Sequence, residues 1–240
     1  MKKIGIDAGG TLTKIAYEEN GRIHVKTYPN EQLKELIQWL QMTAPNARLY
    51  VTGGKRKELE TAPHLNITPT NEFETLVKGT RFLLEQEKEK TEQSFVLVSS
   101  GTGTSIFYVT STPYERSLGS GLGGGTWMGL GKLVSGEDSF HQLVKRAKKG
   151  DHAKSDLLAR DIYAPNHPPI EGSLTAANFG KAHVNETADT SDHLAALIQL
   201  IGETVLQLAG QVAAAYQVET IVFTGSTLDG NAKLQHVLSS

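Results

Sequence analysis

The chain of 240 residues contains no cysteine. This absence excludes a disulfide-linked scaffold, a thiolate nucleophile and any zinc or iron–sulfur site with cysteine ligands. An excess of charge of one sign is also missing, because 24 Lys and Arg residues stand against 26 Asp and Glu residues. The resulting net charge of -2 argues against a nucleic-acid partner, which requires a basic face.

Long apolar runs are absent as well. No stretch approaches the roughly 18 apolar residues of a membrane span, and residues 1–10 lack the apolar segment of a signal peptide. The eight histidines show no metal-binding spacing such as His-Glu-x-x-His, and no Gly-x-Ser-x-Gly motif indicates a hydrolase. We therefore expect a cytoplasmic protein without a membrane partner.

Glycine, in contrast, is abundant and clustered. It accounts for 24 of the 240 residues, above the typical share of about 7%. The first cluster, Ala8-Gly9-Gly10, follows a short apolar strand at 4–7, and residues 13–17 read as a second strand that returns from it. Asn20-Gly21 is a strong hairpin signal before a third strand at 23–28. The chain is therefore predicted to open with three consecutive strands.

The remaining elements are predicted from apolar periodicity and from caps. In the first half they are a helix near 33–40 capped by Asn30, a strand at 49–52, a short polar helix, a strand at 66–68 and a helix from Asn71 to Leu84. In the second half they are strands at 95–99 and 105–109, helices at 126–135, 138–148 and 191–217, a strand at 221–224 and a final helical piece.

The opening motif recurs about 90 residues later. Strand 95–99 ends in the turn Gly101-Thr102-Gly103-Thr104, and strand 105–109 returns from it. A strand, a Gly/Thr turn and a second strand, found twice in one chain, predict a duplicated βββαβα lobe with similar turns facing a cleft. We place the lobes at residues 1–92 and 93–240.

The segment Asp7 to Lys14 suits the phosphates of a nucleotide. Its glycines let backbone N–H groups approach phosphate oxygens, Thr11 and Thr13 offer hydroxyl donors, and Lys14 adds a positive charge. Asp7 can hold Mg²⁺, directly or through water, because this hard cation prefers carboxylate oxygen. The segment is neither a Walker A nor a dinucleotide-binding sequence, and a plain hairpin turn is the alternative interpretation.

Two other glycine segments carry weaker signals. The run from Gly119 to Gly125 precedes a helix expected near Thr126, where free N–H groups and the helix dipole favour an anion. A flexible hinge is the alternative. Gly225-Ser226 follows an apolar strand and can contact adenosine, or it is an ordinary turn.

These motifs, in this order, resemble those of the bacterial type II pantothenate kinases, members of the acetate and sugar kinase/Hsp70/actin superfamily. The matching motifs are Asp-x-Gly-Gly-Thr-x-x-Lys, Gly-Thr-Gly-Thr-Ser, Gly-Gly-Gly-Thr, Leu-Thr-Ala-Ala-Asn-Phe-Gly at 174–180 and Thr-Gly-Ser. The resemblance extends from Lys3 to about Asn231. It implies an α/β fold of duplicated ribonuclease-H-like (actin-like ATPase) lobes with ATP in the cleft between them. Family members continue beyond the position of Ser240 with a further strand and helix.

The resemblance also implies an activity. It is the ATP-dependent phosphorylation of pantothenate to 4'-phosphopantothenate, with Mg²⁺, by a homodimer, as the first step of coenzyme A biosynthesis. The implied ATP-binding residues are Asp7, Ala8, Gly9, Gly10, Thr11, Leu12, Thr13, Lys14, Thr102, Gly124, Gly125, Thr126, Trp127, Met128, Phe140 and Ser226. Phe140 stands where the family has a tyrosine. The implied acceptor site comprises Glu72 as the catalytic base, Arg116, Thr175 and Ala176.

From the residues alone, Glu72 and Arg116 are open to two readings. Glu72 lies in the first turn of its helix, where the dipole favours an ionised carboxylate, and Glu74 forms the capping box with Asn71. Glu72 is thus available as a base, or it is an exposed glutamate. Arg116 can bind a carboxylate bidentately or lie on the surface. Another superfamily kinase, acting on a sugar or amino sugar, and a non-enzymatic ATP-driven switch remain as alternatives.

Overall fold

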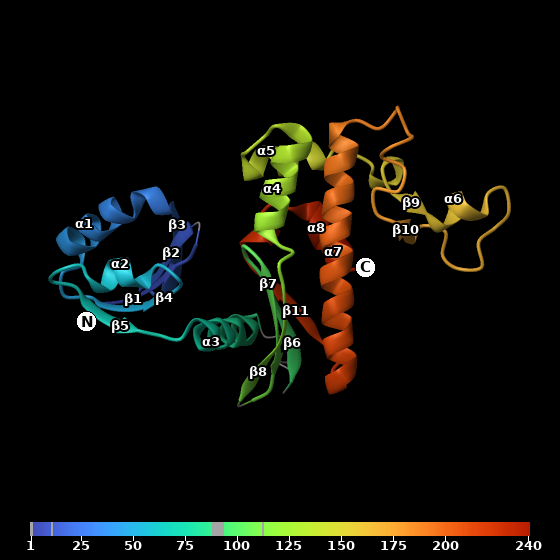
Figure 1. The fold of residues 1–240 in the computed structure, drawn as a ribbon. Helices are drawn as coiled ribbons and strands as arrows, with labels where there is room; N and C mark the ends of the chain where they lie inside the picture. The colour runs from blue at the N-terminus through green and yellow to red at the C-terminus, as the bar shows by residue number, and fades with distance from the viewer. Residues whose placement is uncertain (1, 11, 88–93, 112) are drawn as a thin grey trace. The chain divides into compact units, whose positions relative to one another are not determined.

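Sheets of mixed strand direction organise the chain in the computed structural model (Figure 1), which describes residues 2–10, 12–87, 94–111 and 113–240. The predicted α/β class is confirmed at this level. The chain divides into two compact units, Met1–Thr91 and Glu92–Ser240. Each unit is described in turn.

Unit 1 is built on a five-stranded sheet with the order β3-β2-β1-β4-β5. Its strands are β1 (Lys3–Ala8), β2 (Leu12–Glu19), β3 (Arg22–Pro29), β4 (Arg48–Thr52) and β5 (Asn66–Pro69). β2 runs antiparallel to β1 and to β3, whereas β4 runs parallel to β1 and to β5. Asn20 and Gly21 both adopt positive φ, at 54° and 73°, as a two-residue hairpin turn requires. The three opening strands are therefore confirmed.

The core of unit 1 lies on one face of this sheet. The helical segments of the unit are η1 (Asn30–Gln32), α1 (Leu33–Thr43), α2 (Arg56–Glu60) and α3 (Glu72–Gln86). Because side chains alternate along a strand, Ile4 and Ile6 of β1 point to the same face and pack with Leu36 and Leu40 of α1. Each of these buried side chains contributes about 1.5–3 kcal/mol. Asp7 consequently points to the opposite face.

The predicted cap of α1 is wrong. The first turn is a 3-10 helix preceded by Pro29, and no side-chain hydrogen bond caps either segment. Asn30 instead turns its amide toward the loop between β1 and β2. By contrast, Asn71 caps α3 as predicted, with its side-chain oxygen accepting from Glu74 N.

Unit 2 has a four-stranded sheet with the order β11-β6-β7-β8. Its main elements are β6 (Phe95–Ser100), β7 (Thr104–Val109), β8 (Tyr114–Ser120), α4 (Gly124–Ser135), α5 (Phe140–Ala147), α7 (Thr190–Tyr216), β11 (Ile221–Thr224), η3 (Ser226–Leu228) and α8 (Ala232–Leu238). β7 is antiparallel to β6 and β8, and β11 is parallel to β6. Strand order and direction thus match those of β4-β1-β2-β3 in unit 1. The hairpin predicted to recur is present.

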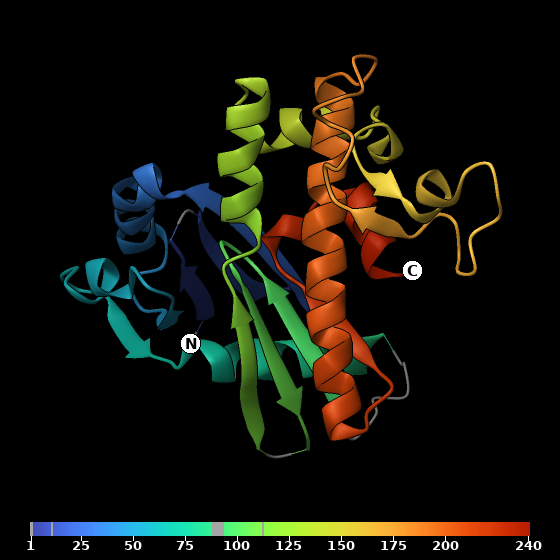
Figure 2. The same cartoon turned by 45° about the vertical axis from the view of Figure 1, so that its right-hand side comes forward.

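Helix α7 forms the centre of unit 2 and runs along its sheet (Figure 1, Figure 2). Its buried side chains, among them Leu194, Leu197, Ile201 and Val205, pack against β6, β7, α4, α5 and α8. By length and composition α7 is apolar enough to span a membrane. Half of its most apolar 18-residue stretch, however, is buried inside the protein. This burial is typical of the core helix of a globular unit.

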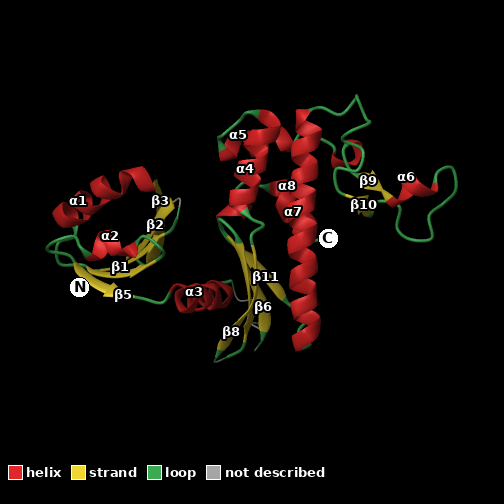
Figure 3. Ribbon diagram, viewed as in Figure 1, coloured by secondary structure: helices red, strands yellow, loops and turns green. Residues whose placement is uncertain are grey.

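The segment between α5 and α7 is mostly loop (Figure 3). The sequence analysis predicted no helix or strand in this segment. It contains η2 (His152–Lys154), β9 (Leu157–Leu158), α6 (Ala159–Tyr163) and β10 (Thr175–Ala177). β9 and β10 pair in a separate two-stranded sheet. These short elements, and strand β8, were missed because they are too short or too polar to show periodicity.

Candidate nucleotide and acceptor sites

The loop after β1 carries the two charges predicted for phosphate and metal. Asp7 pairs with Lys14 across β1 and β2, and Lys14 Nζ lies 3.6 Å from Asp7 Oδ2. Both side chains are about 40% exposed, so the ion pair adds little to stability. Asp7 and Lys14 therefore remain accessible to a ligand on the sheet face opposite α1.

Asn30 fixes the backbone of this loop. Its Nδ2 donates to Gly9 O at 3.1 Å and to Gly10 O at 2.7 Å, and its Oδ1 accepts from Thr13 Oγ1 at 2.9 Å. In a trans peptide the C=O and the following N–H point in opposite directions. With Gly9 O held on Asn30, the N–H of the exposed Gly10 points away from Asn30, as a phosphate donor requires.

One predicted role in this loop needs correction. Thr13 is fully buried, and its hydroxyl donates to Asn30, so it is not presented as a phosphate donor. Thr13 supports the loop from inside. The side chain of Ala8 is also fully buried, and Leu12 is partly buried at the start of β2. Thr11, the other predicted hydroxyl donor, lies outside the described residues.

Gly53 positions Asp7. Its φ is +95°, and a Cβ there would lie 2.3 Å from Ala8 O and 2.8 Å from Asp7 Oδ1. The chain after β4 can therefore pass this close to the end of β1 only with glycine. Lys55 N donates to Ala8 O at 2.9 Å and completes the contact. The carboxylate of Asp7 therefore lies close to the Gly53 backbone.

A cavity of about 700 Å³ lies beside these residues, within unit 1. Asp7, Lys14 and Thr52 line it from the sheet, and Asn71 and Glu74 line it from α3. Thr52 is 6% exposed, and among the described residues its Oγ1 has no hydrogen-bond partner. The cavity therefore offers a carboxylate, an ammonium group and a hydroxyl along one side.

Glu72, the predicted base, is the first residue of α3 and is exposed. Its neighbours Asn71 and Glu74 line the cavity, whereas Glu72 is not among the lining residues. The carboxylate of Glu74 pairs with Lys78 one turn further along the helix. The structure therefore leaves Glu72 at the positive end of α3 without bringing it to Asp7 and Lys14.

In unit 2, the glycine run docks the start of α4 onto the turn after β6. Gly124 N donates to Gly101 O and Gly125 N donates to Thr102 O, each at 2.8 Å. A Cβ at Gly124 would lie 2.9 Å from Gly101 O, and one at Gly125 would lie 3.0 Å from Thr102 O. The prediction of free N–H donors is therefore wrong for these two groups, because the turn already uses them.

The neighbouring predicted residues lie mainly against the core of unit 2. Trp127 is 1% exposed, so its indole is not available to a nucleotide. Met128 and Phe140 are partly buried against the same core. Thr126 Oγ1 donates to Gly121 O at 2.9 Å. Ser226 begins η3 directly after Gly225, whose φ of +122° lets β11 approach Ser100 O.

Arg116, predicted to bind the acceptor, lies on β8. Its Nε and one terminal nitrogen are each 3.3 Å from Ser105 Oγ on β7. A Cβ at Gly119 would lie 2.2 Å from the guanidinium, so glycine leaves the space that this group occupies. The register of β7 and β8 shifts between the pairs Ile106–Leu118 and Phe107–Arg116. Such a bulge changes the direction of the side chains beside it. Arg116 is thus directed along the sheet of unit 2.

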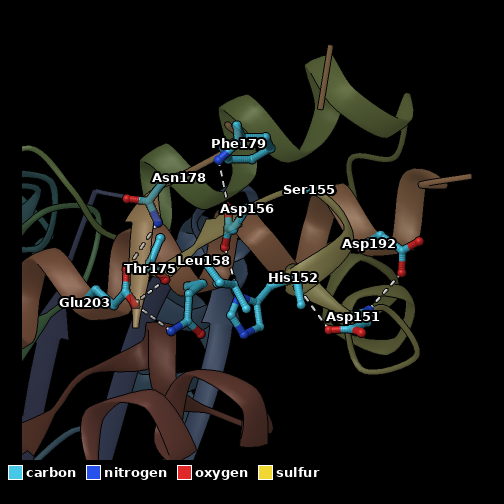
Figure 4. Close-up of polar contacts among 12 residues, drawn as sticks. Asp151, His152, Ser155, Asp156, Leu158, Thr175, Asn178, Phe179, Asp192 and Glu203 are labelled. Atoms are coloured by element: carbon cyan, nitrogen blue, oxygen red, sulfur yellow. Dashed lines mark hydrogen bonds and ion pairs between the residues drawn. The ribbon is translucent and has the colours of Figure 1, made fainter. Parts of the chain in front are cut away.

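Thr175 and Ala176, also predicted for the acceptor, belong to β10. Thr175 Oγ1 donates to Glu203 Oε1 of α7 at 2.7 Å, within a polar cluster shown in Figure 4. The sequence analysis missed Glu203, Asp156 and the other carboxylates of this cluster. One signal was available, because Glu203 is the single charged residue between Leu194 and Val212. A charge within an apolar stripe indicates a paired, partly buried group.

Asp192 ties the start of α7 to the loop before β9. Its carboxylate accepts from Asp151 N at 2.8 Å, from Asp189 N at 3.0 Å and from Lys154 Nζ at 3.1 Å. Burial alone would raise the pKa of Asp192, but the two backbone N–H groups and Lys154 outweigh it and hold that pKa below its ordinary value. The same contact raises the pKa of Lys154.

Fold and sites together define an α/β protein of two units, each with a Gly/Thr hairpin loop after its first strand. Residues 18–240 match the family model described as Fumble. The chain therefore belongs to the Fumble family, and it groups there with the type II pantothenate kinases, as the sequence motifs predicted.

Three relatives named type II pantothenate kinase illustrate this similarity. The protein of Oceanobacillus iheyensis is 46% identical over 237 residues, which cover 99% of this chain and 88% of the relative. The protein of Bacillus cereus strain G9842 is 41% identical over 244 residues, covering 100% of this chain and 89% of the relative. The protein of Bacillus anthracis is 42% identical over 243 residues, which cover 99% of this chain and 87% of the relative.

Proposed function

We propose that the protein is a pantothenate kinase, which transfers the γ-phosphoryl group of ATP to the terminal hydroxyl of pantothenate. The product, 4'-phosphopantothenate, is the first intermediate of coenzyme A biosynthesis, and we place the enzyme in the cytoplasm. The observation that carries the proposal is the 46% identity, over 99% of the chain, to a protein named type II pantothenate kinase.

We also propose that both units are actin-like, ribonuclease-H-like lobes, each of which contributes residues that bind ATP. The support comes from each unit taken by itself. The order and direction of β4-β1-β2-β3 repeat in β11-β6-β7-β8, and in both sheets a Gly/Thr loop follows the first strand. The lobes are residues 1–92 and 93–240.

Phosphoryl transfer requires positioning and charge stabilisation more than covalent chemistry. In unit 1, the Gly10 N–H and Lys14 bind phosphate oxygens, and Asn30 keeps the loop in shape. Asp7 fits Mg²⁺, because its half-exposed carboxylate is a hard oxygen ligand, and this ion is usually held by one or two carboxylates with the phosphates. Bound there, Mg²⁺ would neutralise phosphate charge.

Unit 2 supplies the rest of the proposed nucleotide site. Thr102 stands at the tip of the second loop, and Ser226 follows β11 on the adenosine side. Gly124 and Gly125 keep the second loop in place through their contacts with Gly101 and Thr102. Thr126, Trp127, Met128 and Phe140 then support this site by packing rather than through exposed donors.

For the acceptor, we propose Glu72 as the catalytic base that takes the proton of the pantothenate hydroxyl as it attacks phosphorus. Its position in the first turn of α3 favours the ionised form that a base requires. Arg116 binds the pantothenate carboxylate, and Thr175 with Ala176 shapes the pocket. The acceptor site proposed here therefore combines an anionic base with a cation for the carboxylate of pantothenate.

The test measures ADP formation with MgATP and either pantothenate or a panel of hexoses and amino sugars. The wild type is compared with Glu72→Gln and with the control Glu85→Gln, an exposed glutamate of the same helix that does not line the cavity. We expect turnover with pantothenate alone, a loss of about 10²–10⁴-fold for Glu72→Gln, and a change below about threefold for the control. ADP formation with a sugar only, or without any acceptor, would instead support another kinase or a nucleotide switch.

We further propose a homodimer. The segment 159–184 carries several large apolar side chains on its surface, including Ile162 at 56% exposure and Val184 at 65%. Apolar side chains gathered on one segment are typical of a surface that another chain covers. Light scattering of the wild type and of an Ile162→Asp, Val184→Asp double variant tests the proposal. A wild-type monomer would contradict it.

A further inference from the structure

Glu203 is the charged residue in the apolar middle of α7, and its carboxylate faces β10 (Figure 4). One oxygen accepts from Thr175 Oγ1 at 2.7 Å and from Gln199 Nε2 at 2.8 Å. The other accepts from Asn178 Nδ2 at 3.2 Å. Two of these three donors belong to the segment 175–180, so Glu203 holds the beginning and middle of that segment.

Asp156 holds the far end of the same segment. It is fully buried, its Oδ1 accepts from Phe179 N at 2.7 Å, and its Oδ2 lies 2.9 Å from His152 Nδ1 (Figure 4). Phe179 has a φ of +57°, which a residue other than glycine adopts only when its surroundings hold it there. A Cβ at Gly180 would lie 2.7 Å from Leu157 Cβ, so the chain is also packed closely at this point.

The backbone pairing of β10 is too short to fix the segment by itself. β10 has three residues, its partner β9 has two, and their register shifts between Thr175 and Ala177. Two such short strands have marginal stability on their own. The conformation of 175–180 therefore depends on the two carboxylates, of which Glu203 is the one that contacts Thr175.

Glu203 also decides what Thr175 can offer to a ligand. A hydroxyl has one hydrogen to donate and two lone pairs to accept with. Because the Thr175 hydrogen is committed to the Glu203 carboxylate, which only accepts, the partly exposed Thr175 Oγ1 presents lone pairs alone. It therefore selects a group of the acceptor molecule that donates a hydrogen bond, such as a hydroxyl or an amide N–H.

We propose that Glu203 is a positioning residue for the acceptor substrate, which orients Thr175 and Asn178 so that Thr175 Oγ1 accepts a hydrogen bond from the hydroxyl or amide of pantothenate. This inference rests on the proposed function, since pantothenate supplies both kinds of donor. Glu203→Gln tests it, because an amide can donate to Thr175 Oγ1 and so turn the threonine hydrogen toward the ligand.

The experiment measures KM for pantothenate, KM for ATP and kcat for the wild type, Glu203→Gln, Asn178→Ala and the control Asp138→Asn. Asp138 forms a surface ion pair with Lys132 in the same unit. We expect KM for pantothenate to rise about tenfold in Glu203→Gln and less in Asn178→Ala, with KM for ATP and kcat within about twofold. The control should match the wild type.

A purely structural role would move both KM values together or lower the amount of folded enzyme, and that result would overturn the inference. So would an unchanged KM for pantothenate in Glu203→Gln. Hydrogen exchange supplies a readout independent of activity, with faster exchange of the 175–180 amides expected in Glu203→Gln and no change expected in the control Asp138→Asn. A wild type that does not phosphorylate pantothenate overturns the proposed function and this inference with it, whereas an active wild type with an insensitive variant overturns only this inference.

Discussion

The side-chain amide of Asn30 donates to the carbonyl oxygen of Gly10 at 2.7 Å, and so joins the end of β3 to the loop that follows β1. The same side chain holds Gly9 O and the buried hydroxyl of Thr13. A single asparagine therefore determines the shape of the proposed phosphate loop of unit 1. This arrangement makes Asn30 a sharper test of that loop than any residue predicted from its motif.

Replacing Asn30 with Ala is expected to raise KM for ATP about tenfold and to lower the free energy of unfolding by about 1–3 kcal/mol, since Thr13 loses its buried partner. Steady-state kinetics and urea denaturation measure the two effects. Thr43→Ala is the control, because it removes an exposed hydrogen bond to Trp39 O in the same unit. An unchanged KM for ATP in Asn30→Ala would contradict the proposed role of the loop.

Gly53 and Gly54 offer a matched pair of substitutions. Gly53→Ala places a methyl group 2.3 Å from Ala8 O at a φ of +95°, whereas a Cβ at Gly54 meets nothing within 4 Å. We expect Gly53→Ala to destabilise the protein by about 1–3 kcal/mol and to lower activity at limiting Mg²⁺, because Asp7 must move. Gly54→Ala should change neither. Equal activity of both variants across a Mg²⁺ titration would argue against Asp7 as the metal ligand.

The start of α4 gives a second such pair. An added Cβ at Gly124 would lie 2.9 Å from both Gly101 O and Thr227 Oγ1, whereas one at Gly129 in the same helix meets nothing within 4 Å. Gly124→Ala should therefore displace the second loop, destabilise unit 2 and weaken ATP binding. Gly129→Ala should stabilise the helix by up to about 1 kcal/mol. Thermal denaturation with and without ATP checks both, and a harmless Gly124→Ala would refute the docking role of the glycines.

The sequence predicts those parts of the fold that depend on near neighbours. Asn20-Gly21 defines its turn locally, and the alternation of Ile4 and Ile6 determines which face of β1 is buried. Asn30 was assigned wrongly because its partners are 17 to 21 residues away, so a helix cap was the only local interpretation. Strand β8 was missed because its bulge and the polar run around Arg116 interrupt the alternation.

The candidate site shows the same limit. The Gly/Thr loops are visible as motifs, but the N–H groups of Gly124 and Gly125 prove to be used by Gly101 and Thr102, more than 20 residues earlier. Glu203 binds Thr175 and Asn178 across 28 and 25 residues. Such contacts form only when the tertiary structure brings the segments together, so a pattern read along the chain can indicate a buried charge without naming its partner.

Asp192 predicts how stability depends on pH. Its pKa is lowered in the folded protein, so its carboxylate stabilises the fold above the ordinary aspartate pKa of about 4, and this stabilisation is lost as pH falls through the lower, folded-state pKa. We expect Asp192→Asn to be less stable than the wild type by about 1–2 kcal/mol at pH 7. A neutral amide oxygen accepts more weakly from Asp151 N and Asp189 N, and the amide NH₂ group cannot bond to either of these donors. Urea denaturation measures this difference.

The difference between the two proteins should then shrink steadily below about pH 4, because protonation removes from the wild type the charge that the variant lacks. Asp161 provides an internal comparison, since its hydrogen bond from Lys181 lowers its pKa as well and both proteins retain it. Both should therefore still lose stability in acid, but the wild type more steeply. Parallel curves, with a gap that does not depend on pH, would mean that Asp192 acts through its shape as a helix cap and not through its charge.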